Sequence, residues 1–179
     1  MTDQELIKQL LEPTTRQKAF KLLVDTYKER LYWHIRKIVI SHDDSDDVLQ
    51  NTFIKVFKNL NNFKGDSQLY TWMYRIATNE SLSYLKSKSI RSRLNNENMH
   101  QQMVDRLQAD VYFEGNDIQL KLQKAIAQLP EKQKLVFNMR YFDEIKFKDM
   151  EKILDTSEGA LKASYHIAVK KIQKKLSTD

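Results

Sequence analysis

The apolar residues in the first half of the chain recur at helical spacing. One face of a long helix is marked by Phe20, Leu23, Tyr27, Leu31, Ile35 and Ile38, and a shorter helix before it ends ahead of Pro13. We interpret residues 41–47, "SHDDSDD", as a connection whose aspartates then lie at the N-terminus of the next helix, where negative charge is favourable. That helix is predicted over residues 48–60.

A glycine loop then leads into a further helix. Asp66 or Ser67 is predicted as its N-cap, and its apolar periodicity continues to about Leu85, where the first compact unit ends. From about Ser87 to Asp117 the sequence becomes polar, first basic and then acidic. This change of composition indicates a linker that contains no more than one weak helix.

A second periodic region follows the linker. Helices are predicted over residues 118–129, 130–142 and 146–154, and a turn at residues 155–157 precedes a last helix over residues 158–176. With three glycines and two prolines, the chain offers little turn chemistry for sheets. The predicted fold class is therefore all-α, with two small helical domains joined by a flexible linker.

The composition indicates the size of the domains and excludes several classes of protein. The chain has 179 residues, of which 41% are hydrophobic, so it can form one ordinary domain or two small ones. Its net charge of +6 is either a general surface property or the sign of a surface that binds a polyanion. There is no cysteine, no secretion signal at the start and no apolar run of membrane-spanning length. We therefore expect a soluble cytoplasmic protein without disulfides, thiolate metal sites or membrane insertion.

The last forty residues have the parts of a helix-turn-helix, in which the second helix enters the major groove of DNA. Leu161, Tyr165, Ala168 and Ile172 recur on one face and are expected to meet the core of this module. Lys162, His166, Val169 and Lys170 then face outward with Ser164 nearby, and Lys170, Lys171, Lys174 and Lys175 suit phosphate contacts. The alternative is a helical hairpin with a solvated lysine face, and these residues alone leave both interpretations open.

One isoleucine lies off the apolar face of the helix over residues 48–60. The predicted buried stripe consists of Leu49, Phe53, Val56, Phe57 and Leu60. Ile54 lies away from that stripe, among Asp47, Gln50, Asn51 and Lys58. A polar patch with an apolar centre is typical of a surface that docks another protein. A single exposed isoleucine is also common, and without outside information that simpler interpretation is favoured.

The helix after the glycine loop has two neighbouring ridges. Leu69, Met73, Ile76 and Ala77 form the predicted buried stripe, while Trp72, Arg75, Asn79, Leu82 and Lys86 form the ridge beside it. An aromatic ring can stack on an unpaired base, and guanidinium and amide groups beside it can bind the nucleic-acid backbone. The loop before the helix adds Phe63, Lys64 and Gly65, and glycine permits positive φ. The alternative is that Trp72 is a half-buried core residue with Arg75 extending beside it.

Two stretches resemble the signatures of one family. Residues 63–86, "FKGDSQLYTWMYRIATNESLSYLK", are similar to F-x-G-x-S-x-F-x-T-W-L-Y-R-I-A-x-N-x-x-L-D-x-L-R. Residues 129–164, "LPEKQKLVFNMRYFDEIKFKDMEKILDTSEGALKAS", are similar to L-P-x-x-x-R-x-V-F-x-L-R-Y-x-[DE]-x-x-S-Y-x-E-I-A-x-[IL]-L-x-x-S-x-G-T-V-K-S-R. Both signatures resemble those of the sigma factors of bacterial RNA polymerase, in the compact extracytoplasmic-function branch. The resemblance covers roughly residues 16–88 and 118–176.

The resemblance implies a domain organisation and a function. Residues 1–88 would form sigma region 2, residues 89–117 the linker, and residues 118–179 sigma region 4 with its helix-turn-helix. Such a protein binds core RNA polymerase at the clamp of the largest subunit and directs promoter-specific initiation. It recognises and melts the minus-ten element and reads the minus-thirty-five element. It is not an enzyme, and no cofactor or metal is implied.

Residue roles follow from the same resemblance. The polymerase contact would be made by Asp47, Gln50, Asn51 and Ile54. The minus-ten reader would comprise Phe63, Lys64, Gly65, Asp66, Ser67, Trp72, Arg75 and Asn79. The minus-thirty-five reader would comprise Ser157, Lys162, Ser164, His166 and Lys170. An anti-sigma factor commonly inhibits members of this branch, and the sequence leaves open whether this chain has one.

Two other functions compete with this hypothesis. A helix-turn-helix repressor would bind duplex DNA tightly and specifically without polymerase, and its N-terminal unit would dimerise or sense a ligand. A metal-dependent phosphohydrolase would use "HDD" at residues 42–44, but it needs further spaced histidines. The chain has four histidines in all, His34, His42, His100 and His166. The enzymatic hypothesis is therefore the weakest of the three.

Overall fold

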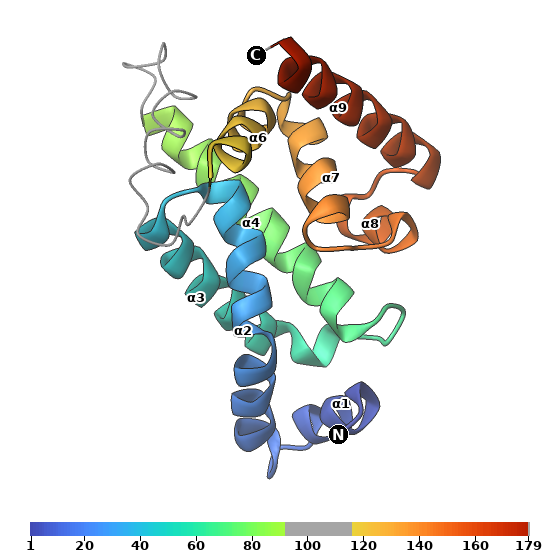
Figure 1. Cartoon of the computed structure of the whole chain (residues 1–179). Helices are drawn as coiled ribbons and strands as arrows, with labels where there is room; N and C mark the ends of the chain where they lie inside the picture. Colours follow the sequence, from blue (N-terminus) through green and yellow to red (C-terminus); the bar gives the residue numbers. More distant parts are fainter. Residues whose placement is uncertain (92–115, 179) are drawn as a thin grey trace. The chain divides into compact units, whose positions relative to one another are not determined.

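A computed structural model of the chain describes residues 1–91 and 116–178, and these residues form helices and turns without a strand (Figure 1). The helices are α1 (Asp3–Leu11), α2 (Arg16–Val39), α3 (His42–Asn59), the 3-10 helix η1 (Leu60–Asn62), α4 (Leu69–Arg91), α6 (Asp117–Ala127), α7 (Glu131–Tyr141), α8 (Phe147–Leu154) and α9 (Glu158–Thr178). The all-α prediction is confirmed. Most of the predicted linker lies outside the described residues.

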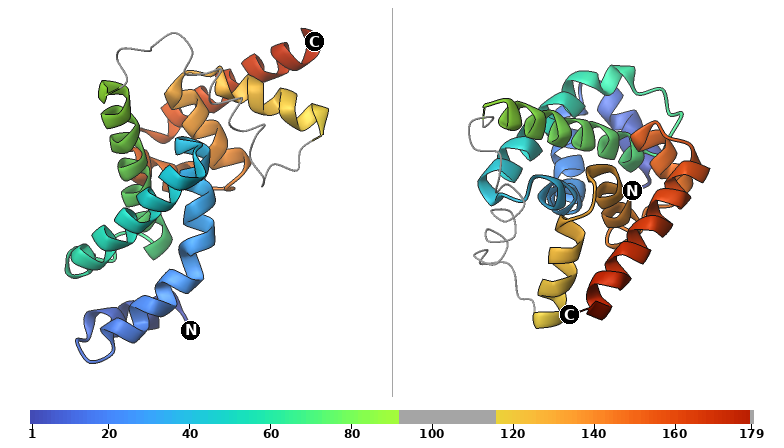
Figure 2. Two further views of the ribbon diagram at one scale, coloured as in Figure 1. Left: turned by 90° about the vertical axis from the view of Figure 1, so that its left-hand side faces the viewer. Right: turned by 90° about the horizontal axis from the view of Figure 1, so that it is seen from above.

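The first compact unit contains Met1–Lys86, and most of the residues after it belong to a second unit. In the first unit α2 and α3 lie side by side, as both views in Figure 2 show. Leu23, Leu31 and Ile35 on the predicted face of α2 have no exposed surface. Val56 of α3 and Met73 and Ala77 of α4 are equally buried, so three helices contribute to the apolar core of this unit.

The connection between α2 and α3 is shorter than predicted. Helix α3 begins at His42, so residues 42–47 are its first turns rather than a connection. Ile40 has a φ of 71° and a ψ of −37°, and the Ser41 amide donates to the Val39 carbonyl at 2.9 Å. This γ-turn reverses the chain at one residue. Ser41 then caps α3 by accepting from the Asp44 amide at 3.4 Å, and Asp43 and Asp44 lie in the first turn as expected.

Two further details of the first unit differ from the prediction. Gln68, not Asp66 or Ser67, is the N-cap of α4, because its carbonyl accepts the first helical hydrogen bond, from Trp72 at 3.2 Å. The helix also continues past Leu85 to Arg91. In α3, Phe57 is 43% exposed instead of buried, although its ring packs edge-on against Phe20 at 4.9 Å.

The second unit contains α6 to α9. Its core comprises Ala125, Ile126, Leu129, Phe137, Ala168 and Ile172, with Tyr165 and Val169 packed against it. Leu161 is fully buried, so the predicted inner face of α9 is confirmed. Val169 was predicted to face outward and is partly buried instead. Asp155 ends α8 in the left-handed conformation, and the turn that it opens leads directly into α9, which completes the helix-turn-helix.

Candidate protein and nucleic-acid interfaces

The outer face of α3 carries the predicted protein-docking residues. Asp47, Gln50, Asn51 and Ile54 are spaced so that they share one side of the helix, and all four are exposed. Ile54 is 46% exposed, which confirms that it lies off the buried stripe. We call these four residues the α3 face. It is polar with one apolar side chain at its end, so it can bury a small hydrophobic contact within a hydrogen-bonding rim.

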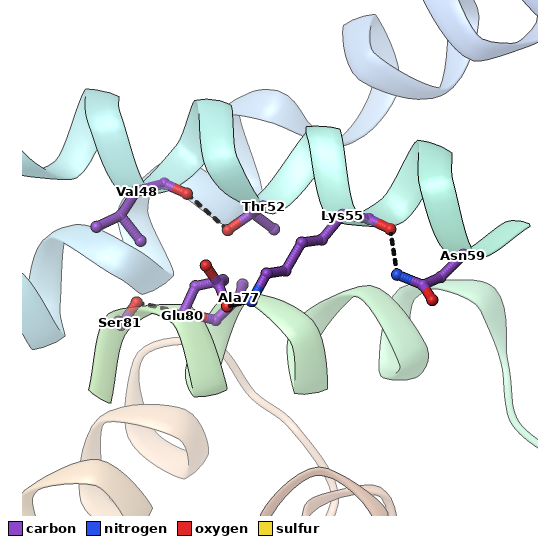
Figure 3. Close-up of polar contacts among 7 residues, drawn as sticks. All are labelled: Val48, Thr52, Lys55, Asn59, Ala77, Glu80 and Ser81. Carbon is purple, nitrogen blue, oxygen red and sulfur yellow. Dashed lines mark hydrogen bonds and ion pairs between the residues drawn. The ribbon is translucent and has the colours of Figure 1, made fainter. Parts of the chain in front are cut away.

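The inner side of α3 is fixed against the rest of its unit. Val48 and Val56 are buried, and the Thr52 hydroxyl donates to the Val48 carbonyl at 2.7 Å (Figure 3). Lys55 forms an ion pair with Glu80 of α4, which joins the two helices in the same view. This pair cannot be predicted from the sequence, because spacing within one helix carries no information about the partner helix. The contact helps to fix how the α3 face is presented.

The glycine loop before α4 has the conformation that its glycine permits. Gly65 has a φ of 76°, and a Cβ added there would meet nothing within 4 Å. The requirement for glycine is therefore backbone conformation rather than lack of space. Lys64, Gly65 and Asp66 are exposed, whereas Phe63 and Ser67 are half-buried at the two ends of the loop. The middle of the loop is thus open to a ligand.

Trp72 lies against the start of this loop. Its ring centroid is 5.0 Å from that of Phe63, with the planes inclined at 46°, and both side chains are half-buried. Arg75 and Asn79 follow on the same ridge of α4 and are exposed. The structure therefore brings together the loop and the ridge, which we call the α4 reader: Phe63, Lys64, Gly65, Asp66, Ser67, Trp72, Arg75 and Asn79. Leu69, Met73 and Ala77 are buried as predicted, while Ile76 is half-buried.

A buried polar contact holds α4 to α2. The His34 Nε2 atom lies 2.8 Å from the Thr78 hydroxyl, and the ring centroids of His34 and Tyr74 are 4.5 Å apart. The Tyr74 hydroxyl donates to the Arg30 carbonyl at 3.3 Å. Because a buried polar group is costly unless it is hydrogen-bonded, these contacts favour one orientation of α4. Sequence reasoning missed them, although His34 lies between the apolar residues Leu31 and Ile35.

The outer side of α9 carries the second set of predicted nucleic-acid residues. Lys162, His166 and Lys170 are exposed, and Ser164 is half-buried. Lys162 pairs with Glu158 one turn earlier, at 3.1 Å between Nζ and Oε1. Ser157 accepts from the Ala160 amide at 3.3 Å, so its hydroxyl caps the helix. We call Ser157, Lys162, Ser164, His166 and Lys170 the α9 reader.

The described part of the chain has no metal site and no helix that could span a membrane. No three histidine, cysteine or carboxylate side chains gather there as a metal site would require. Across residues 1–91 and 116–178, no helix is long and apolar enough to cross a bilayer.

Both units of the chain match known protein families. The family described as Sigma-70 region 2 matches residues 23–90, and the one described as Sigma-70, region 4 matches residues 119–172. The RNA polymerase sigma-H factor of Pseudomonas aeruginosa is 30% identical over 98% of this chain and 96% of its own length. The ECF RNA polymerase sigma-E factor of Escherichia coli K12 is 29% identical over 98% of this chain and 95% of its own length. The chain belongs to the extracytoplasmic-function sigma factors.

Two solved structures share the fold. CnrH in complex with the cytosolic domain of CnrY matches with a TM-score of 0.72 at 20% identity, covering 99% of this chain and 98% of its own. The sigma factor RpoE, in complex with the anti-sigma factor NepR from Bartonella quintana, matches with a TM-score of 0.68 at 19% identity. That match covers 90% of this chain and 99% of the other.

Membership of the family establishes the general function. The sigma factor binds core RNA polymerase and directs promoter-specific transcription initiation, and it is not an enzyme. A repressor that acts without polymerase is not favoured.

Proposed function

We propose that this sigma factor divides initiation among its three surfaces. The α3 face docks on the clamp of the largest polymerase subunit, the α4 reader opens and holds the minus-ten element, and the α9 reader contacts the minus-thirty-five element. Residues 1–88 would then serve as region 2, residues 89–117 as the linker and residues 118–179 as region 4.

The pairing of Trp72 with Phe63 beside an open glycine loop carries the minus-ten proposal. Extruding a base from the duplex costs a few kcal/mol. Stacking on an aromatic side chain returns about 1–3 kcal/mol per base. Trp72 can therefore offset the cost at one base step, while Arg75 and Asn79 are exposed where they can hold the backbone. Polymerase has to supply the remaining energy, so we expect the protein alone to bind promoter DNA weakly.

The α9 reader suits a duplex. Lys170 is exposed beside Lys171, Lys174 and Lys175, and such lysines position a helix on phosphates without reading sequence. Lys162 forms an ion pair with Glu158, and this pairing weakens the attraction of the Lys162 ammonium to a phosphate. His166 and Ser164 remain as the groups best suited to read base edges in the major groove.

The α3 face suits a protein partner because Ile54 is an exposed apolar side chain within a polar rim. We propose the cytoplasm as the site of action, since that is where polymerase is found. An anti-sigma factor is a further proposed partner, because the structurally similar sigma factor RpoE binds the anti-sigma factor NepR.

Run-off transcription with core polymerase tests the minus-ten assignment. We expect Trp72→Ala to lower transcript from a duplex promoter by about tenfold or more, and to lower it much less on a template that is already melted at the minus-ten element. Trp33→Ala is the matched control, because Trp33 is 41% exposed on α2, outside the α4 reader. Equal amounts of transcript from Trp72→Ala and wild type on duplex DNA would show that Trp72 is not needed for promoter opening.

A further inference from the structure

A single guanidinium closes the C-terminus of α1. The Arg16 Nε atom donates to the Leu10 carbonyl at 2.9 Å, and Nη2 donates to the Leu11 carbonyl at 3.4 Å. The last carbonyls of a helix have no partner within it, and a cation there also interacts favourably with the helix dipole. Arg16 thus holds the end of α1 from the first residue of α2.

The same guanidinium reaches the segment that leads into the α4 reader. Arg16 Nη2 donates to the Asn61 Oδ1 atom at 2.9 Å, and Asn61 belongs to η1. The Phe63 amide closes η1 by donating to the Leu60 carbonyl at 3.2 Å. Phe63 packs on Trp72 and is the first residue of the α4 reader. Asn61 lies two positions before it in the sequence.

Helix α1 is itself well anchored, so it can serve as a fixed support. Leu6 and Leu10 are buried, and the Thr15 hydroxyl donates to the Gln9 carbonyl at 2.8 Å. The Tyr27 hydroxyl of α2 donates to the Asp3 carboxylate at 3.0 Å. Burial, followed by this hydrogen bond, raises the pKa of Tyr27 to about 12, so the donor stays protonated well into the alkaline range.

We propose that Arg16 is a positioning residue for promoter opening: through Asn61 it fixes the entry of the glycine loop and thereby the place of Phe63 against Trp72. The Sigma-70 region 2 match begins at residue 23, so α1 and Arg16 lie outside it. The proposal rests on the proposed role of the α4 reader. It assigns to α1 a function in DNA opening rather than in stability alone.

Substitution of Asn61 separates the two functions of Arg16. Asn61→Ala removes the link to η1 but leaves both α1 carbonyls bonded to the guanidinium, whereas Arg16→Ala removes all three contacts. Lys18→Ala is the matched control, since Lys18 is an exposed cation on the same helix. The full-length variants are reconstituted with core polymerase. The rate of open-complex formation on duplex and premelted promoters is then measured, together with polymerase affinity.

The expected results follow from one shared hydrogen bond. Asn61→Ala and Arg16→Ala should each slow opening of duplex promoter by about fivefold, and the double variant should be no slower than Arg16→Ala. Polymerase affinity and rates on premelted template should stay within about twofold of wild type. Lys18→Ala should open at the wild-type rate. Only Arg16→Ala should also lower the unfolding temperature, because it alone frees the end of α1.

Two outcomes overturn the proposal in distinguishable ways. If Trp72→Ala slows opening and Asn61→Ala opens at the wild-type rate, the α4 reader stands and the positioning by Arg16 is wrong. If Trp72→Ala has no effect on duplex opening, the proposed function of the reader fails first, and the role of Arg16 fails with it.

Discussion

Trp72 and His166 are both proposed to meet DNA, but their surroundings differ. Trp72 is half-buried against Phe63, on a helix that the His34–Thr78 contact fixes to α2. His166 is exposed on α9. A side chain that replaces a base in a stack must be held in place, whereas one that reads an intact groove can adapt to it. We therefore expect substitutions in the buried supports of the α4 reader to change stability and function together. Substitutions of the exposed Lys162, His166 and Lys170 on α9 should change function alone.

The largest expected contrast in stability is between Thr78→Val and His166→Ala. Thr78→Val keeps the shape of the side chain but takes a hydrogen-bond partner from buried His34, which should cost about 1–3 kcal/mol of unfolding free energy. His166→Ala should change it by less than about 0.5 kcal/mol. Urea unfolding followed by tryptophan fluorescence checks the first value, because both tryptophans, Trp33 and Trp72, lie in the first unit. For His166→Ala, loss of helical circular dichroism in urea is the appropriate signal.

Gly65, in the loop before α4, and Gly159, in α9, should respond in opposite ways to substitution by alanine. Gly65→Ala forces a side chain into positive φ, which costs about 1–2 kcal/mol, and should slow opening of a duplex promoter by about fivefold. Gly159→Ala lies in α9 with open space around the added methyl group, so it should stabilise that helix by about 0.5 kcal/mol. Circular dichroism and the kinetics of open-complex formation measure the two effects. A fast-opening Gly65→Ala protein would show that the loop conformation is unimportant.

The smallest expected effects are those on phosphate contacts of α9. Lys170→Ala should weaken promoter binding by the holoenzyme at all sequences alike, and should reduce the slope of log affinity against log salt by about one. Glu158→Gln should strengthen binding by about twofold, because it releases Lys162 from its ion pair. Filter binding over a range of salt concentrations tests both. A change of preferred sequence in Lys170→Ala would contradict a purely phosphate role.

Periodicity was sufficient to predict the helices, because one face of each helix is buried. Leu23, Leu31 and Ile35 were assigned correctly, since each is apolar and faces the core. The start of α3 was missed, because a γ-turn at a β-branched residue such as Ile40 has no sequence signal. Val169 was misplaced because a spacing rule cannot show how far the core extends around α9.

The candidate surfaces were predictable to the extent that exposure follows from helical spacing. Ile54, Arg75 and Asn79 are exposed, as that spacing predicts. Trp72 is half-buried, as the alternative interpretation of this helix expects. Contacts between helices could not be predicted in this way. Arg16 and Asn61 are far apart in sequence and carry ordinary polar side chains, so only the three-dimensional structure shows their hydrogen bond.

The most direct test of the central claim uses a fluorescent base analogue at successive positions of the minus-ten non-template strand. In holoenzyme with the wild-type protein, we expect one position to show the spectral change of a base stacked on an aromatic ring, and Trp72→Ala to abolish it. Trp33→Ala should leave that signal intact. An unchanged signal in Trp72→Ala at every position would contradict the claim that the α4 reader captures an extruded base.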